Sequence, residues 1–142
     1  LNISKYIMYM ATALKSQSPS PHAIYTDANL PKWLKMLYLF YHFYDENPMT
    51  IRKMRTHPEI REALDIAELN NEGINRLLAR LKSWGYLHSK ELYRYGPKEY
   101  AISKCGVQKL YRKGLITEEE YDNMVASIPL KLEGWLERRR KY

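Results

Sequence analysis

The pattern of apolar positions is clearest between residues 69 and 87. Four apolar side chains recur there at the i, i+3, i+4, i+7 spacing of one helix face: Ile74, Leu77, Leu78 and Leu81. Asn70 is expected to cap the start of this helix, Glu72 suits the positive end of its dipole, and Gly85 permits a left-handed end. These signals predict a helix with a buried apolar stripe and an exposed polar face.

The polar face of this predicted helix carries side chains that suit the reading of DNA bases. Arginine and asparagine can pair bidentately with the edges of guanine and adenine, and small residues allow close approach. The side chains predicted on this face are Asn71, Glu72, Asn75, Arg76, Ala79, Arg80 and Ser83. We therefore interpret the stretch as a recognition helix that enters the DNA major groove.

After this helix the pattern predicts two strands, at 87–93 and 99–103. Gly96 and Pro97 lie between them and supply the chain reversal. Three cations decorate this hairpin: Lys90, Arg94 and Lys98. They are expected either to contact a minor groove or flanking phosphates, or to protect an edge strand from unwanted pairing.

The ordered pair of helix and hairpin resembles the winged-helix DNA-binding superfamily, especially MarR-like and PadR-like regulators. The resemblance lies in Arg-Leu-Leu-Ala-Arg-Leu at 76–81, in Gly-Tyr-Leu at 85–87, and in the strand-to-helix junction at 100–106. It implies a mainly α fold with a small β-hairpin wing, namely a winged helix-turn-helix core with additional N- and C-terminal helices. It also implies a transcriptional regulator that binds double-stranded DNA as a homodimer.

Upstream, residues 31–45 are expected to form the first helix of this core, with Pro31 in its first turn. Thr50 is expected to cap a short helix at 50–54, and the long interval before Asn70 indicates either an extra helix at 58–64 or a misplaced boundary. Three cations of this region are well placed to hold phosphates: Arg52, Lys53 and Arg55.

The flanking segments are predicted to be helical as well. Residues 1–15 carry an apolar stripe, and the Pro-containing stretch 16–22 reads as a linker or surface loop. Ser103 is expected to cap a helix that Gly114 ends, with Tyr111 among its inward-facing residues. A capping box at 117–120 begins another helix, which Pro129 separates from a last one.

The chain is accordingly divided into an N-terminal helix and linker (1–22), a winged domain (23–114) and C-terminal helices (115–142). The predicted helix at 31–45 is apolar nearly all round, so we expect it to need two partners, one of which could be a second subunit. The alternative of an aromatic ligand pocket is less common for such stripes. The candidate dimer contacts are Tyr6, Met10, Trp33, Phe40, Tyr44, Leu132 and Trp135.

Charge supports a polyanionic partner. The chain holds 23 Lys and Arg against 16 Asp and Glu, a net charge of +7. Residues 70–104 contain seven Lys or Arg and three Glu, so this segment alone carries +4. An even mixture of signs would be expected if these charges were merely solvated.

The sequence gives little support to a membrane protein, a secreted protein, a metal-binding protein or an enzyme. No apolar run is long enough to span a bilayer and no secretory pattern begins the chain, so we expect a cytoplasmic, nucleoid-associated protein. The four histidines lack zinc-site spacing, so we expect no metal and no cofactor. Cys105 reads as a small core residue. Without a nucleophile–base pair or a phosphate loop, we predict no enzyme.

Two alternatives to a transcriptional regulator stay open. The same module could serve as a DNA-binding adaptor in plasmid or chromosome segregation or in replication. It could also be an interaction scaffold without DNA specificity, in which the aromatic helix at 31–45 and the acidic residues 118–120 bind a partner protein.

Overall fold

The computed structural model describes residues 17–70 and 73–137 of the chain. The described part is mainly helical and contains one small antiparallel hairpin. The predicted helix at 1–15, with the candidate dimer residues Tyr6 and Met10, lies outside the described residues, as do Asn71 and Glu72.

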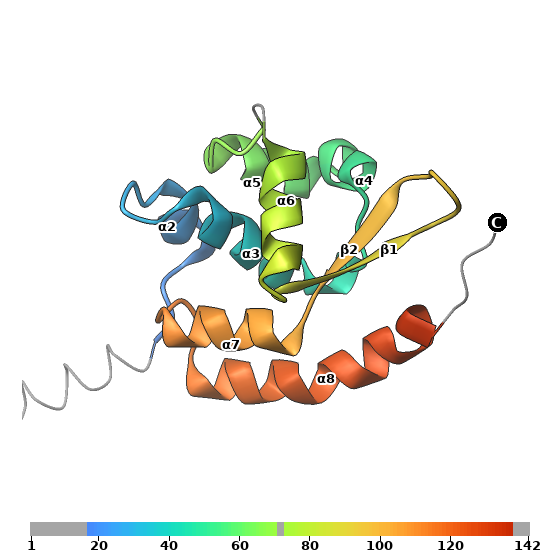
Figure 1. Ribbon diagram of the computed structural model, residues 1–142. Helices are drawn as coiled ribbons and strands as arrows, with labels where there is room; N and C mark the ends of the chain where they lie inside the picture. The colour runs from blue at the N-terminus through green and yellow to red at the C-terminus, as the bar shows by residue number, and fades with distance from the viewer. Residues whose placement is uncertain (1–16, 71–72, 138–142) are drawn as a thin grey trace, which may run out of the picture.

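The elements follow one another in a single chain order. They are α2 (Pro21–Thr26), α3 (Lys32–His42), the 3-10 helix η1 (Tyr44–Glu46), α4 (Ile51–Thr56), α5 (Pro58–Ile66), α6 (Ile74–Ser83), β1 (Leu87–Glu91), β2 (Lys98–Ile102), α7 (Lys104–Arg112) and α8 (Glu118–Glu137). The hairpin projects away from α6 on one side of the molecule, and α7 and α8 run side by side in opposite directions (Figure 1). The predicted mainly α fold with a β-hairpin is confirmed.

Helix α3 is the centre of the hydrophobic core. Every side chain from Leu34 to Phe40 is buried, because α2, α6, α7 and β2 all pack against this helix. Because α3 is apolar nearly all round, it was expected to need two packing partners, and the same chain supplies both. Phe40, which is 0% exposed, was wrongly predicted to reach a second subunit. Trp33 and Tyr44 are partly buried against the same core.

A buried asparagine joins the end of α3 to the hairpin. The Asn47 amide donates to the carbonyl oxygens of Phe40 and Phe43, both at 3.0 Å, and its Oδ1 accepts from the Ile102 amide at 3.0 Å. Two residues later, Met49 and Tyr100 exchange two backbone hydrogen bonds of 2.8 Å. Strand β2 thereby fixes the position from which α4 begins.

The short helices α4 and α5 confirm the predicted extra helix. Thr50 caps α4 by accepting from the Lys53 amide at 3.1 Å, and His57 Nδ1 caps α5 by accepting from the Ile60 amide at 3.3 Å. Pro58 stands in the first turn of α5, where its missing N–H leaves no helical bond unmade.

Helix boundaries differ from the predictions at both ends of α3 and before it. The predicted linker extends only to Ser20, whose side chain caps α2 by accepting from the Ala23 amide at 3.2 Å. Pro21 therefore opens a helix, as proline does at the first helical position. Pro31 is the N-cap of α3 and not part of its first turn.

Helix α7 confirms the predicted Ser103 cap and the left-handed end at Gly114, whose φ is +75°. For two side chains of α7 the sequence wrongly predicted a position in the core. Cys105 is exposed, and Tyr111 is 38% exposed and stacks on Tyr121 with ring centroids 5.2 Å apart. The buried side of this helix is formed by Gly106, Val107 and Leu110.

Helix α8 runs through Pro129, which was predicted to separate two helices. A proline removes one backbone hydrogen bond, but a helix that is packed along its length can continue past it. The predicted capping box is confirmed: Thr117 Oγ1 accepts from the Glu120 amide at 3.2 Å, and Glu120 Oε1 accepts from the Thr117 amide at 3.0 Å.

The far part of α8 packs on the hairpin of its own chain. Leu132 is 1% exposed and Trp135 4% exposed, and the Trp135 indole donates to Glu99 Oε1 at 3.1 Å. Both residues were predicted as dimer contacts, and both predictions are wrong because the same chain covers them. None of the described helices is long and apolar enough to cross a membrane.

Candidate nucleic-acid interface

Helix α6 presents its apolar side to the core and its polar side outward. Ile74, Leu78 and Leu81 are buried and Leu77 is partly buried, as the sequence predicts. The five polar-face positions within the described residues are all exposed: Asn75, Arg76, Ala79, Arg80 and Ser83. The predicted two-sided character of this helix is therefore confirmed.

The end of α6 follows the prediction, but its start does not. Gly85 has a φ of +80°, and the amides of Gly85 and Tyr86 donate to the carbonyls of Lys82 and Leu81, both at 2.9 Å, which completes a Schellman motif. The helix begins only at Ile74, after Gly73 with a φ of +115°, and no side chain caps it. The predicted Asn70 cap is wrong, because that residue lies too far before the first turn.

A groove of about 410 Å³ lies where α4, α6 and the start of β2 meet. Four of the predicted DNA-contacting residues line it: Arg52 from α4, Asn75 and Ala79 from α6, and Lys98 from β2. The fold thus brings together side chains that are up to 46 positions apart in the sequence.

Four further residues line the same groove and were missed as site residues: Thr50, Ile51, Pro97 and Tyr100. Their local signals indicate a helix cap, a turn and a strand, which say nothing about the groove. The Met49–Tyr100 bridge would have revealed them, but it joins residues distant in the sequence. Burial raises the pKa of Tyr100 above its ordinary value.

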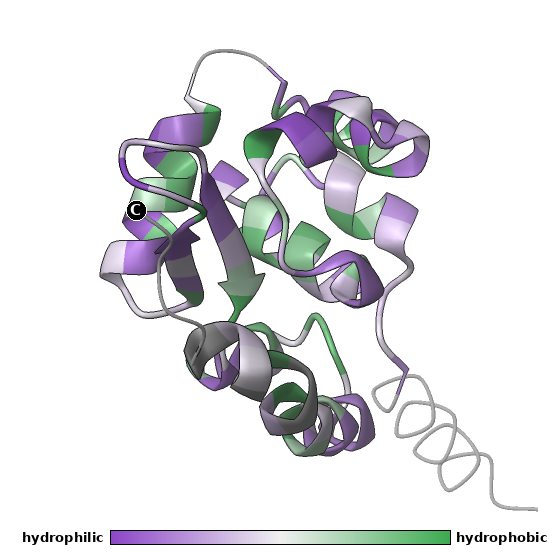
Figure 2. Cartoon of the chain, turned by 90° about the vertical axis from the view of Figure 1, so that its right-hand side faces the viewer, coloured by the Kyte–Doolittle hydropathy of each residue, from purple (hydrophilic) through white to green (hydrophobic). Residues whose placement is uncertain are grey.

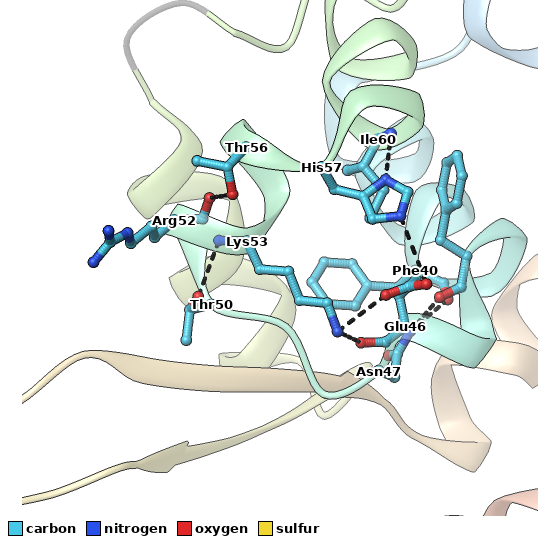
Figure 3. Close-up of polar contacts among 10 residues, drawn as sticks. Phe40, Glu46, Asn47, Thr50, Arg52, Lys53, Thr56, His57 and Ile60 are labelled. Atoms are coloured by element: carbon cyan, nitrogen blue, oxygen red, sulfur yellow. Dashed lines mark hydrogen bonds and ion pairs between the residues drawn. The ribbon is translucent and has the colours of Figure 1, made fainter.

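Lys53 and Arg52 are neighbours in the sequence, but they have different surroundings. Lys53 Nζ lies 3.1 Å from Glu46 Oε2 and donates to the Glu46 carbonyl at 2.8 Å (Figure 3). His57 Nε2 lies 3.6 Å from the other Glu46 oxygen, Oε1. Lys53, more than His57, lowers the pKa of the Glu46 carboxyl. The Arg52 guanidinium points away from this cluster (Figure 3).

A phosphate contact of Lys53 would therefore have to compete with a carboxylate of its own chain. Lys90 also has a partner within the chain. Its ammonium donates to the Trp135 carbonyl at 2.7 Å, which directs it toward α8. Arg55 is exposed on α4 but does not line the groove.

Two other predicted arginines lie over aromatic rings. The Arg80 guanidinium carbon is 5.9 Å from the ring centroid of Trp84, which contacts Trp33 edge to face. The Arg94 guanidinium carbon is 5.2 Å from the ring centroid of Tyr95. Neither arginine lines the groove, and Ser83 is likewise outside it, with its hydroxyl donating to the Arg80 carbonyl at 2.7 Å.

The hairpin changes character along its length. In β2 the residues pass from exposed Lys98 to buried Ile102, which Figure 2 shows as a change from hydrophilic to hydrophobic along the strand. In the turn, the Leu92 amide donates to the Pro97 carbonyl at 3.0 Å. The free end of the hairpin therefore offers Tyr95, 89% exposed, to solvent.

The groove is lined by an amide, a methyl side chain, two cations and the residues Thr50 and Tyr100, which carry hydroxyls. These groups can form hydrogen bonds and attract negative charge. Among the described residues no three His, Cys, Asp or Glu side chains are grouped to hold a metal ion. The arrangement suits the binding of an anionic polymer that carries hydrogen-bonding bases.

No protein-family model, no curated protein and no solved structure matches this chain.

Proposed function

We propose that this chain binds double-stranded DNA as a winged helix-turn-helix protein, with α6 in the major groove and the hairpin as the wing. The observation that carries the proposal is the groove in which Arg52, Asn75, Ala79 and Lys98 meet. Three separate elements contribute to it, and each had features of a DNA contact in the sequence alone.

The shape of the exposed surface supports this proposal. Helix α6 turns its polar side outward along its described length, and an α-helix fits the width of the major groove. Arg76 lies on the side of α6 opposite the buried Leu78 and Leu81, so a DNA duplex that meets this helix would meet Arg76. The guanidinium could then donate two hydrogen bonds to a guanine.

The position of the cations supports it as well. Arg52 and Lys98 line the groove from α4 and from β2, the two elements that border it together with α6. Cations beside a recognition helix can neutralise phosphates that border a major groove. The excess positive charge of the whole chain acts in the same direction at longer range.

Transcriptional regulation in the cytoplasm, close to the nucleoid, is the role we propose for such binding. A homodimer on a two-fold-related site remains part of the proposal. Of the candidate dimer contacts within the described residues, Trp33 and Tyr44 keep partial exposure. Either residue could contribute to an isologous interface.

The experiment that tests this function is selection of bound duplexes from a random pool, followed by titration of the selected site and of random DNA at several salt concentrations. We expect a preferred sequence, and an affinity that falls as salt rises. Mass measurement of the complex gives its stoichiometry. Equal, weak binding to all duplexes would contradict sequence-specific recognition and favour the scaffold alternative.

A further inference from the structure

The two α6 side chains that line the groove have the chemistry of an A·T reader. We propose that Asn75 recognises an adenine and that Ala79 contacts the methyl group of a thymine within two base pairs of it. This inference rests on the proposed function and adds to it the base composition at the centre of the site.

Asn75 is available for such a contact. It is exposed, it lines the groove, and its side chain makes no hydrogen bond to the rest of the described chain. Its amide offers a donor and an acceptor side by side. In the major groove only adenine presents the matching pair, an N6 donor beside an N7 acceptor, whereas guanine presents two acceptors.

Ala79 lies one helical turn after Asn75 and lines the same groove. Its methyl side chain can form no hydrogen bond, so a polar base edge facing it would lose water without gaining a partner. The thymine C5-methyl is the apolar group of the major groove. The four residues from Asn75 to Ala79 rise about 6 Å along the helix, which is less than two base-pair steps of about 3.4 Å each.

The arginines of α6 do not compete for this position. Arg76 and Arg80 do not line the groove, and Arg80 lies over the Trp84 ring. The two cations that do line it come from α4 and β2. A guanine opposite Asn75 would place one of its two acceptors against the amide oxygen, which cannot donate a hydrogen bond.

The test uses the full chain and the duplex selected from the random pool. Each adenine of the site is replaced in turn by 7-deazaadenine, which lacks N7, and each thymine by uracil, which lacks the methyl group. We expect one deazaadenine to weaken binding about tenfold. One uracil within two base pairs of it should weaken binding about threefold.

Two variants assign these effects to their side chains. The deazaadenine effect should disappear in Asn75→Ala, and the uracil effect should disappear in Ala79→Gly. Arg112→Ala, an exposed substitution on α7, should leave both effects intact. Persistence of either effect in its matched variant, or a selected site in which no A·T pair is sensitive, would overturn the inference. In both outcomes specific binding survives, whereas a pool that yields no preferred duplex refutes the proposed function itself.

Discussion

Arg52 and Lys98 differ from Lys53 and Lys90 in what the fold does with their charge. The first two line the groove beside α6, while Lys53 is held by Glu46 and Lys90 by the Trp135 carbonyl. In the sequence all four are simply cations predicted to contact DNA, and nothing in the charge pattern distinguishes them. A cation becomes part of a binding surface only where the tertiary structure leaves it without a closer partner, and this depends on contacts between distant elements.

The largest effect is expected from removing the Asn47 side chain, which joins the end of α3 to β2. Asn47→Ala loses three hydrogen bonds and leaves buried backbone groups unpaired. We expect the free energy of unfolding to fall by about 3 kcal/mol. Urea denaturation measures it, with Asn123→Ala on the exposed side of α8 as the control. A loss no greater than that of the control would mean that Asn47 does not hold these elements together.

The next effect concerns base reading by α6. Arg76→Ala should weaken binding to the selected duplex by about 1–3 kcal/mol and relax the preference at one base position. Fluorescence anisotropy on the selected and on random duplexes measures both, with Arg112→Ala as the matched control. Equal losses on the two kinds of DNA would show that Arg76 does not read a base.

A smaller, sequence-independent effect is expected from the groove cations. Lys98→Ala should weaken binding to all duplexes alike and lower the slope of log affinity against log salt by about 1. Lys90→Ala, a substitution on the other strand of the hairpin, should leave that slope unchanged because the Lys90 ammonium faces α8. If the two variants change the slope equally, the distinction between these cations is wrong.

The smallest effect, on the stability of the fold, should come from replacing Glu46, the carboxylate that pairs with Lys53. Lys53 and His57 lower the pKa of Glu46 in the folded chain, so this carboxylate stabilises the fold above its unfolded pKa. That stabilisation is lost as the pH falls through the folded pKa. Glu46→Gln should therefore lower the melting temperature slightly at pH 7, and the difference from the parent chain should vanish in acid.

The Glu46→Gln variant also tests whether the ion pair with Glu46 is what keeps Lys53 from acting like the groove cations Arg52 and Lys98. Without the Glu46 carboxylate, Lys53 can turn to a phosphate, and the salt slope of DNA binding should become steeper in Glu46→Gln. A difference in melting temperature that persists below the folded pKa would argue against the ion pair. An unchanged salt slope would argue that Lys53 lies out of reach of the DNA.

Elements with local signals could be predicted from the sequence. The apolar stripe of α6 and the glycine after it, the Thr50 and Ser103 caps, and the turn at Gly96 each involve residues close in sequence. Helix α3 could be recognised, and its apolar circumference correctly required two partners. The sequence could not show that both partners belong to the same chain.

Several errors come from contacts that span the molecule. Trp135 looked free for a dimer because its partner Glu99 lies 36 positions away. Helix α8 passes Pro129, since packing can hold a helix together where local propensity would end it. For the candidate site, Asn75 and Ala79 followed from helix periodicity, whereas Thr50 and Tyr100 depend on the bridge between Met49 and β2.

The most direct test of the proposed interface is a titration of the isotopically labelled chain with the selected duplex, followed by amide chemical shifts in NMR spectra. The account predicts that the largest changes fall at residues 50–52, 75–79 and 97–100, with α7 and the first turns of α8 nearly unaffected. Changes concentrated on α7 and α8, with the groove residues unmoved, would contradict it.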